Sequence, residues 1–220
     1  MIGTPGQIER GSMEIIRSEL RERGITLPEE NEDVILRCIH ASADFDYAAN
    51  LRFTPGAVQK ATEALRGGTD LVTDTNMALA GISKPGLQKL GASAYCYMAE
   101  PFIADRAKAQ GTTRAAAAMD WAAEQNPGAI LAVGNAPTAL LRIAGQIEDG
   151  LQPALVIAVP VGFVNVVESK ELIFTACSTT GVPCIAAMGR KGGSSIAAAI
   201  CNALIYSAAE LLEPAARGWN

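Results

Sequence analysis

AILAV at residues 129–133 and ALVIAV at residues 154–159 are uninterrupted apolar runs, and each is followed by a turn that contains Gly, Pro or Asn. Neither run alternates between apolar and polar residues. Strands without such alternation are buried on both faces, which is typical of a parallel sheet covered by helices on each side. The two runs therefore predict central strands of an α/β fold.

The same rhythm continues on both sides of these runs. Further short apolar runs predict strands at 70–74, 93–97 and 184–188. Helical periodicity predicts helices at 11–23, 29–41, 56–66, 76–90 (broken near Pro85), 113–124, 137–149, 166–178 and 194–212. The predicted fold is three-layer α/β, a flavodoxin-like parallel sheet flanked by helices, with a helical N-terminal segment. A chain of this length fits one domain, residues 1–220.

The composition excludes several classes of protein. The net charge of −5 argues against a general nucleic-acid binder. The longest apolar stretch, 153–167, is interrupted by Pro160 and Gly162 and is shorter than the ~20 residues of a membrane-spanning helix. The start lacks the basic and apolar regions of a secretory signal. We therefore expect a cytoplasmic protein whose five cysteines, with no C-x-x-C pair among them, are buried free thiols.

Ligands of parallel sheets bind at the carboxyl ends of the strands, on the loops that follow them. The loops here are 74–76, 98–112, 134–137, 160–163 and 189–194. Four of the five are rich in Gly, Pro, Asn or Asp, which permit tight turns and close approach of the backbone to a ligand. The sequence therefore predicts a site at this edge of the sheet.

His40, the only histidine, lies in IHASADFDY at the end of a predicted helix, just before Asp44 and Asp46. A lone histidine is more often structural or on the surface than functional. The helix C-terminus and the neighbouring carboxylates favour its protonated form. Without a second histidine or clustered cysteines, no transition-metal site is expected. If His40 is functional, proton donation is its expected role.

Two turns between a strand and a helix carry weaker signals. In GRKGGS, residues 189–194, glycines let backbone N–H groups converge at a helix start that favours anions, although a turn needed only for packing explains them equally well. GNAPTAL, residues 134–140, offers Asn135 and Thr138 as hydrogen-bonding groups. In the ESK triplet, Glu168 and Lys170 are expected on a solvated helix face rather than in a site.

Taken together, IHASADFDY, LVTDTNMALAGI, AILAVGNAPTAL, PALVIAVPVGFVNVVESKELI and GRKGGSSIAAAICNALI strongly resemble the precorrin-8X methylmutase family, including its cobalt-precorrin-8 branch. The resemblance extends from about Ile15 to Ile205. It implies a flavodoxin-like fold, a homodimer, and an isomerase of cobalamin biosynthesis that moves a methyl group from C-11 to C-12 of a tetrapyrrole macrocycle. Lys191 and the acidic segment after His40 look more like the cobalt-precorrin branch.

The resemblance also implies site residues. His40 falls where the family has its essential histidine, which protonates or hydrogen-bonds the macrocycle. Ser12 and Arg114 fall where the family places a serine and an arginine that contact the substrate. A disc edged with carboxylates needs an apolar pocket with cationic or N–H anchors. The further residues that we expect to bind it are Asn135, Arg190, Lys191, Gly192, Gly193 and Ser194. No cofactor is expected, and any cobalt is carried in the substrate.

Two alternatives stay open at this stage. The chain could be a nucleotide- or phosphosugar-using α/β enzyme with GRKGGS as its phosphate cradle, although the spacings of the nucleotide-binding loops are missing. It could also be a non-catalytic corrinoid carrier that uses His40 as an axial ligand to cobalt.

Overall fold

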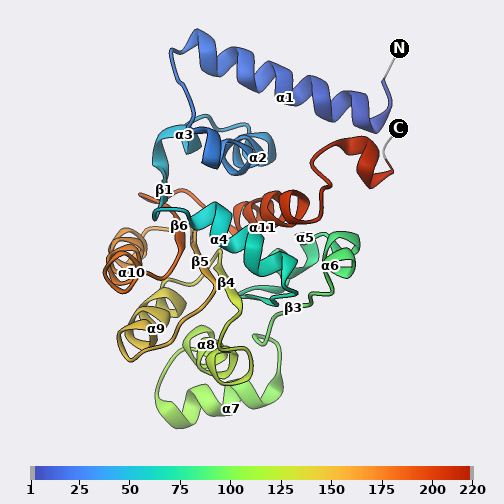
Figure 1. The fold of residues 1–220 in the computed structure, drawn as a ribbon. Helices are drawn as coiled ribbons and strands as arrows, with labels where there is room; N and C mark the ends of the chain where they lie inside the picture. Colours follow the sequence, from blue (N-terminus) through green and yellow to red (C-terminus); the bar gives the residue numbers. More distant parts are fainter. Residues whose placement is uncertain (1–2, 219–220) are drawn as a thin grey trace.

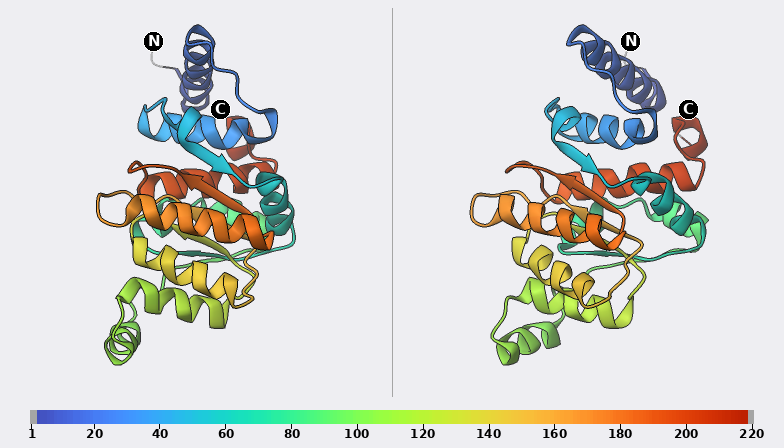
Figure 2. Two further views of the ribbon diagram at one scale, coloured as in Figure 1. Left: turned by 90° about the vertical axis from the view of Figure 1, so that its left-hand side faces the viewer. Right: turned by 60° about the vertical axis from the view of Figure 1, so that its left-hand side comes forward.

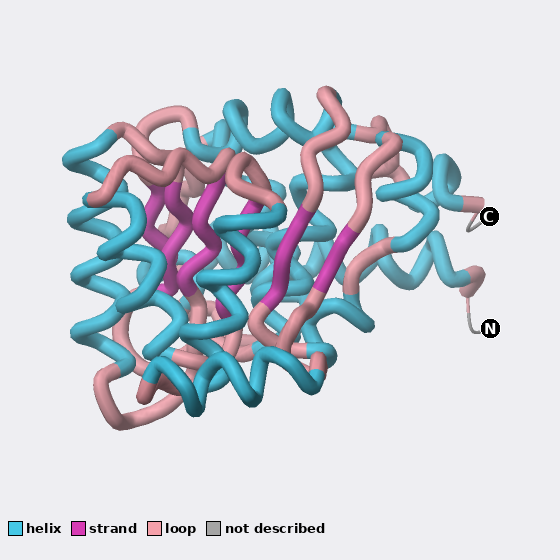
Figure 3. Tube along the Cα trace, turned by 90° about the horizontal axis from the view of Figure 1, so that it is seen from below, coloured by secondary structure: helices cyan, strands magenta, loops and turns pink. Residues whose placement is uncertain are grey.

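The computed structural model describes residues 3–218, so the ends of the expected domain, residues 1–2 and 219–220, lie outside the described part. Helices cover both faces of a six-stranded sheet (Figures 1 and 3). In spatial order the strands are β1 (Leu51–Phe53), β6 (Cys184–Ala187), β5 (Leu155–Ala158), β4 (Ile130–Val133), β2 (Leu71–Thr73) and β3 (Ala94–Tyr95). Strands β2 to β6 are parallel, and β1 runs antiparallel to β6. The α/β class is confirmed.

Successive side chains of the central strands enter two different cores. In β5, Leu155 and Ile157 pack into the core on one face, and Val156 and Ala158 pack into the core on the other. All four are fully buried. Two-sided burial explains why this strand is apolar at every position.

One face of the sheet is covered by α4 (Ala57–Arg66), α5 (Asn76–Gly81), α6 (Lys84–Leu90) and α11 (Ser194–Ala208), and α2 (Glu32–Ser42) packs on α11. The predicted break between α5 and α6 is confirmed. Helix α11 packs very closely on its neighbours. A Cβ at Gly86 of α6 would lie 2.4 Å from Cγ2 of Ile205, so a larger residue would force the two helices apart.

A further helix, α1 (Pro5–Glu22), lies outside this layer (Figure 1). Ile16 and Leu20 pack it against α2. Near the end of the described part, a short 3₁₀ turn, η2 (Pro214–Arg217), also contacts α1.

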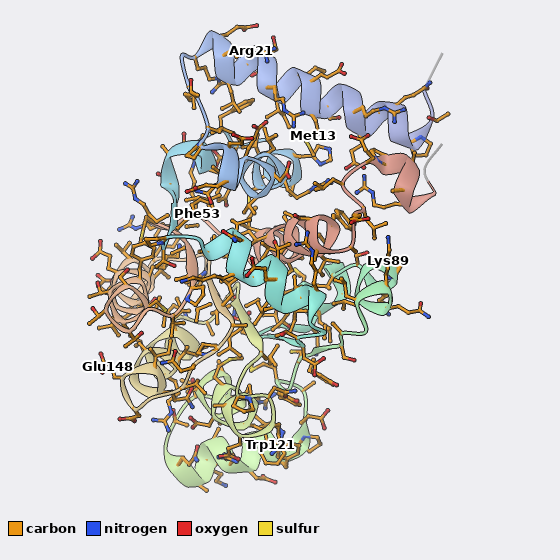
Figure 4. The ribbon with its side chains drawn as sticks, viewed as in Figure 1. Met13, Arg21, Phe53, Lys89, Trp121 and Glu148 are labelled. Carbon is orange, nitrogen blue, oxygen red and sulfur yellow. The ribbon has the colours of Figure 1, made fainter. Side chains whose placement is uncertain are left out.

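The other face is covered by α8 (Arg114–Gln125), α9 (Pro137–Glu148) and α10 (Val166–Thr180), which lie side by side (Figure 2). Helix α7 (Pro101–Gln110) packs outside α8. There Phe102 meets Trp121, labelled in Figure 4, edge to face with 5.0 Å between ring centroids.

Two elements differ from the expectation. Residues 98–112 were predicted as a loop, yet they contain α7, which begins at Pro101 and ends before Gly111 in the left-handed conformation. Those two residues are ordinary helix boundary signals. Strand β1 was not predicted, because three residues with an exposed Arg52 in the middle give no periodicity. Its pairing with β6, Leu51 opposite Ala187, defines it.

Two smaller features complete the fold. The five cysteines are free as expected, four of them buried and Cys96 half-buried. Within residues 3–218, no helix is both long and apolar enough to cross a membrane.

A buried carboxylate joins the ends of β2 and β4, two neighbouring parallel strands. Asp74, directly after β2, is fully buried. Its two oxygens accept N–H groups of Gly134, Asn135 and Ala136, each at 2.8 Å, from the loop that follows β4. Burial raises the pKa of Asp74, and these N–H donors oppose that rise. Every partner is a donor, so the geometry suits an acceptor-only carboxylate.

We expect Asp74→Asn to lower the free energy of unfolding by roughly 2–4 kcal/mol, because its NH₂ group would face N–H donors and leave buried donors unsatisfied. Urea denaturation measures the change. Asp105→Asn, on the exposed side of α7, is the matched control and should stay within about 0.5 kcal/mol of the wild type. Equal stability of both variants would show that the Asp74 charge is not needed.

Candidate functional site at the carboxyl edge of the sheet

The loops after the parallel strands hold one another in place. The hydroxyls of Thr75, after β2, and Ser194, at the start of α11, lie 2.8 Å apart. The N–H of Gly193 donates to the carbonyl of Val159 at 2.8 Å, and the N–H of Gly162 donates to the carbonyl of Arg190 at 3.2 Å. The predicted edge is thus one connected surface.

Packing accounts for part of the GRKGGS motif. Gly192 has φ +156°, and a Cβ there would lie 2.1 Å from the carbonyl oxygen of Val159. Only glycine fits that position. The Gly193 amide was expected to be open to a ligand, and the structure corrects this: the amide already has the Val159 carbonyl as its acceptor.

Arg190 and Lys191 point to different partners. The Arg190 guanidinium lies over the Phe163 ring, 5.2 Å from its centroid, and both residues are exposed. The Lys191 ammonium forms ion pairs of 2.6 Å with Asp44 and 2.5 Å with Asp46. Its hydrogen bonds raise the pKa of Lys191 and lower that of Asp44. Lys191 therefore binds the segment after His40.

Lys170 contradicts its expected position on a solvated helix face. Its side chain has an exposed fraction of 0%. The ammonium donates to the carbonyls of Gly189 at 2.9 Å and Lys191 at 2.8 Å. Burial lowers its pKa to about 8. Helical spacing from Val166 to Lys170 to Ile173 on the buried face of α10 was a signal that could have located it.

His40 is exposed in the last turn of α2, which ends at Ala43 in the left-handed conformation. The expectation of a favoured protonated form is wrong. Partial burial and the charge of Arg37 lower its pKa, Glu9 opposes them, and Arg217 adds to the lowering. Asp44 and Asp46, which pair with Lys191, are not among the groups that shift its pKa.

The charges near His40 belong to a buried cluster. Glu9 of α1 binds Arg37 at 2.6 Å and Arg217 of η2 at 2.7 Å. Both guanidinium groups also lie over the ring of Tyr206 in α11. The cluster joins α1, α2, α11 and η2 beside the histidine.

The other predicted residues have local surroundings of their own. Arg114 and Asn135 are exposed, and hydrogen bonding of Thr113 to Thr138 at 2.8 Å brings the starts of α8 and α9 together near them. The Ser12 hydroxyl donates to the Ile8 carbonyl of its own helix at 2.8 Å. Within residues 3–218, no described hydrogen bond or ion pair joins Arg114 or Ser12 to His40.

Four cavities of the chain are lined by residues other than the predicted site residues. One of about 310 Å³ lies between α1, α2 and the C-terminal segment, beside Met13 (Figure 4). Three others, of about 420, 280 and 270 Å³, lie on other surfaces. None of these four is lined by His40 or by another predicted site residue. Among residues 3–218, no three His, Cys, Asp or Glu side chains are grouped to hold a metal ion.

Fold and site define an α/β protein whose sheet edge presents arginines, an exposed aromatic ring and one histidine, while Asp74 occupies the amides of its 134–136 turn. The sequence model of the family described as precorrin-8X methylmutase matches residues 7–207, and the chain belongs to this family.

Named relatives match along most of their length. The chain is 42% identical to the cobalt-precorrin-8 methylmutase of Salmonella typhimurium, over 93% of this chain and 96% of that protein. It is 37% identical to the precorrin-8X methylmutase of Pseudomonas aeruginosa, over 90% and 93%. The solved precorrin-8X methylmutase of Thermus thermophilus superposes with a TM-score of 0.83 at 39% identity, over 92% of this chain and 98% of that one.

The Glu9 cluster predicts a pH dependence of stability. Burial alone would raise the pKa of Glu9, but hydrogen bonds from Arg217 and Arg37 outweigh it and lower the pKa below its ordinary 4.5. The resulting stabilisation is complete above that value and is lost as the pH falls through the lower pKa of the folded state.

Glu9→Gln should flatten this acid limb and cost about 3 kcal/mol at pH 7, since two guanidinium groups lose their counter-charge. Denaturant unfolding between pH 3 and 7 measures both effects. Glu148→Gln, an exposed residue on α9, should retain the wild-type profile. An unchanged acid limb in Glu9→Gln would contradict the assignment.

Proposed function

We propose that the protein is an isomerase of cobalamin biosynthesis that moves a methyl group from C-11 to C-12 of cobalt-precorrin-8 or precorrin-8X, giving cobyrinate or hydrogenobyrinate. The observation that carries this proposal is the match to proteins named as these methylmutases along nearly the whole chain. A concerted shift of a methyl group needs orientation and one hydrogen-bonding or acidic group, without a covalent enzyme intermediate.

The proposed fold is three-layer and flavodoxin-like. Taken alone and counted along the chain, the parallel strands β2 to β6 lie in the order 2-1-3-4-5, which is that of flavodoxin-like sheets. Ligands of such sheets bind at the switch point, here between β2 and β4. Asp74 occupies the turn amides there. This counts against a phosphate cradle at that turn and favours a ligand held by side chains along the rim.

His40 is the proposed catalytic residue. Partial burial and the charge of Arg37 lower its pKa, which favours the neutral imidazole in the free protein. A neutral ring still has one N–H donor. We infer that this N–H hydrogen-bonds the macrocycle near the migrating methyl group, and that the carboxylates of the substrate raise the pKa of His40 on binding.

Arginines are the proposed anchors for the peripheral carboxylates. Arg114 and Arg190 are exposed, and each can form a bidentate pair with a carboxylate. Phe163, beneath Arg190, is 81% exposed and offers an apolar surface for the disc. Ser12, Asn135, Gly192 and Ser194 remain predicted contacts on the same substrate.

A homodimer is proposed to complete the pocket. None of the four cavities described above within residues 3–218 is lined by His40. Large apolar side chains at the edge stay exposed, Val164 by 78% and Met77 by 72% in addition to Phe163, and α1 exposes Ile8 and Ile15. Exposed apolar patches of this kind mark interaction surfaces. A second copy would bury them and supply the missing wall of a disc-shaped site.

Cobalt is proposed to arrive and leave within the macrocycle. The relative from Salmonella typhimurium, at 42% identity, is named a cobalt-precorrin-8 methylmutase. We therefore propose that the cobalt form is preferred. The function is tested by incubating the protein anaerobically with each macrocycle and identifying the product by NMR. Formation of the C-12 methyl product with a higher kcat/KM for the cobalt form is expected. Tight binding with an unchanged carbon skeleton would instead favour a carrier.

In the same assay, His40→Ala should bind the macrocycle but lose turnover by roughly 10²–10⁴-fold, as for a lost acid or hydrogen-bond donor. Arg114→Lys should chiefly raise KM, since lysine cannot form the bidentate pair. Near-normal kcat in His40→Ala would remove the histidine from the chemistry.

For the oligomer, light scattering at micromolar concentration should give twice the chain mass of 22.9 kDa. Phe163→Ser with Val164→Ser should shift the distribution toward monomer and reduce turnover, whereas Leu172→Ser, an exposed apolar residue on α10, should do neither. A wild-type mass of one chain would rule out the shared pocket.

A further inference from the structure

The backbone of residues 189–191 is held by a buried cation, the ammonium of Lys170. The Lys170 ammonium is fully enclosed and has the carbonyl oxygens of Gly189 and Lys191 at 2.9 and 2.8 Å. Hydrogen bonds from a charged donor in a dry environment are strong and define geometry. Lys170 thus sets the direction in which the backbone of residue 191 presents its side chain.

The Lys191 side chain in turn holds the segment that follows His40. Its ammonium bridges Asp44 and Asp46, which lie 147 and 145 residues away in sequence. The Asp44 carboxylate also accepts the N–H of Asp46 at 3.0 Å. The turn that ends α2 is therefore tied to the GRKGGS loop within four residues of the imidazole.

We propose that Lys170 and Lys191 are positioning residues for His40: Lys170 fixes the 189–191 backbone, and Lys191 clamps Asp44 and Asp46, which keeps the end of α2 in place and the two carboxylates away from the imidazole. The effect of these lysines on catalysis rests on the proposed function. Their effect on the position and pKa of His40 concerns the free protein alone. Lys191, predicted as a substrate contact, acts in this proposal through His40.

The charged groups that face His40 come from three elements: Arg37 of α2 itself, Glu9 of α1 and Arg217 of η2. Without the clamp, Asp44 and Asp46 would add two unpaired negative charges to this set. Carboxylates near an imidazole favour its protonated form. Opening the clamp should therefore raise the pKa of His40.

The chain offers an unusually clean readout, because His40 is its only histidine and gives a single imidazole Hε1 signal in proton NMR. In Lys191→Met, we expect its titration midpoint to rise by about 0.5 unit. Lys170→Met should raise it by a smaller amount, because Lys191 keeps its charge but loses its fixed direction. If Lys170 acts through Lys191, the double variant should match Lys191→Met alone.

Three further variants sharpen the comparison. Lys60→Met, at an exposed lysine of α4, should leave the titration midpoint of His40 unchanged. Lys191→Arg should keep the wild-type midpoint, since arginine can pair with both carboxylates. Should Lys170→Met fail to fold by circular dichroism, Lys170→Gln, which keeps an N–H donor, takes its place in the cycle.

With active enzyme, Lys191→Met should lower kcat about 10-fold and change KM less. The proposal would be overturned by a wild-type midpoint in Lys191→Met or by additive effects of the two lysine variants. It would also be overturned if Lys191→Met raised KM and left kcat unchanged, because Lys191 would then be a substrate anchor. Expected NMR shifts in a protein that converts neither macrocycle would leave the clamp intact and refute only the proposed function.

Discussion

The arrangement of the sheet edge depends on one buried charge, the Asp74 carboxylate. Its three N–H partners in residues 134–136 tie the end of β2 to the start of α9. Parallel strands alone leave the amides at a helix start unsatisfied, and here a side chain of the protein satisfies them. Thr75, next to Asp74, then hydrogen-bonds Ser194 and brings the start of α11 to the same point. The turn that could have cradled an external anion is used to build the edge.

Two-sided burial imposes a second constraint, on residue size. The strands are sandwiched between helices, and the chain fills the space with alanine and branched aliphatic residues rather than aromatic ones. Close contacts such as Gly86 on Ile205 follow from this choice. The few large apolar side chains at the edge, Phe163 and Val164, are then left outside. A tightly packed interior and an apolar rim together support the proposal of a site at the surface between two copies.

The sequence predicted features that depend on neighbours along the chain. Short apolar runs located all five parallel strands. In β4, β5 and β6 burial on both faces leaves no polar position, whereas β3, at the edge of the sheet, exposes Tyr95. Strand β1 was missed, since only its pairing with β6 makes it a strand. The charge state of His40 was misjudged for a similar reason. Asp44 and Asp46 are its neighbours in sequence, but their partner is Lys191. Its pKa is shifted instead by partial burial and by charged groups of α2, α1 and η2. The position of Lys170 on the apolar face of α10 indicated burial, but lysine is usually exposed, so a solvated position was predicted.

A histidine whose pKa is lowered in the free protein suits a large anionic substrate. Partial burial, Arg37 and Arg217 disfavour its imidazolium form before the substrate binds. Carboxylates of the macrocycle would reverse that balance when they arrive, because they supply the negative charge that Asp44 and Asp46, held by Lys191, do not. The proton affinity of the imidazole would then be highest only with substrate in place. Because Lys191 holds Asp44 and Asp46 away from His40, the pKa of the imidazole would respond to the carboxylates of the ligand rather than to those of the protein. This is the chemical role of the clamp that Lys170 and Lys191 form.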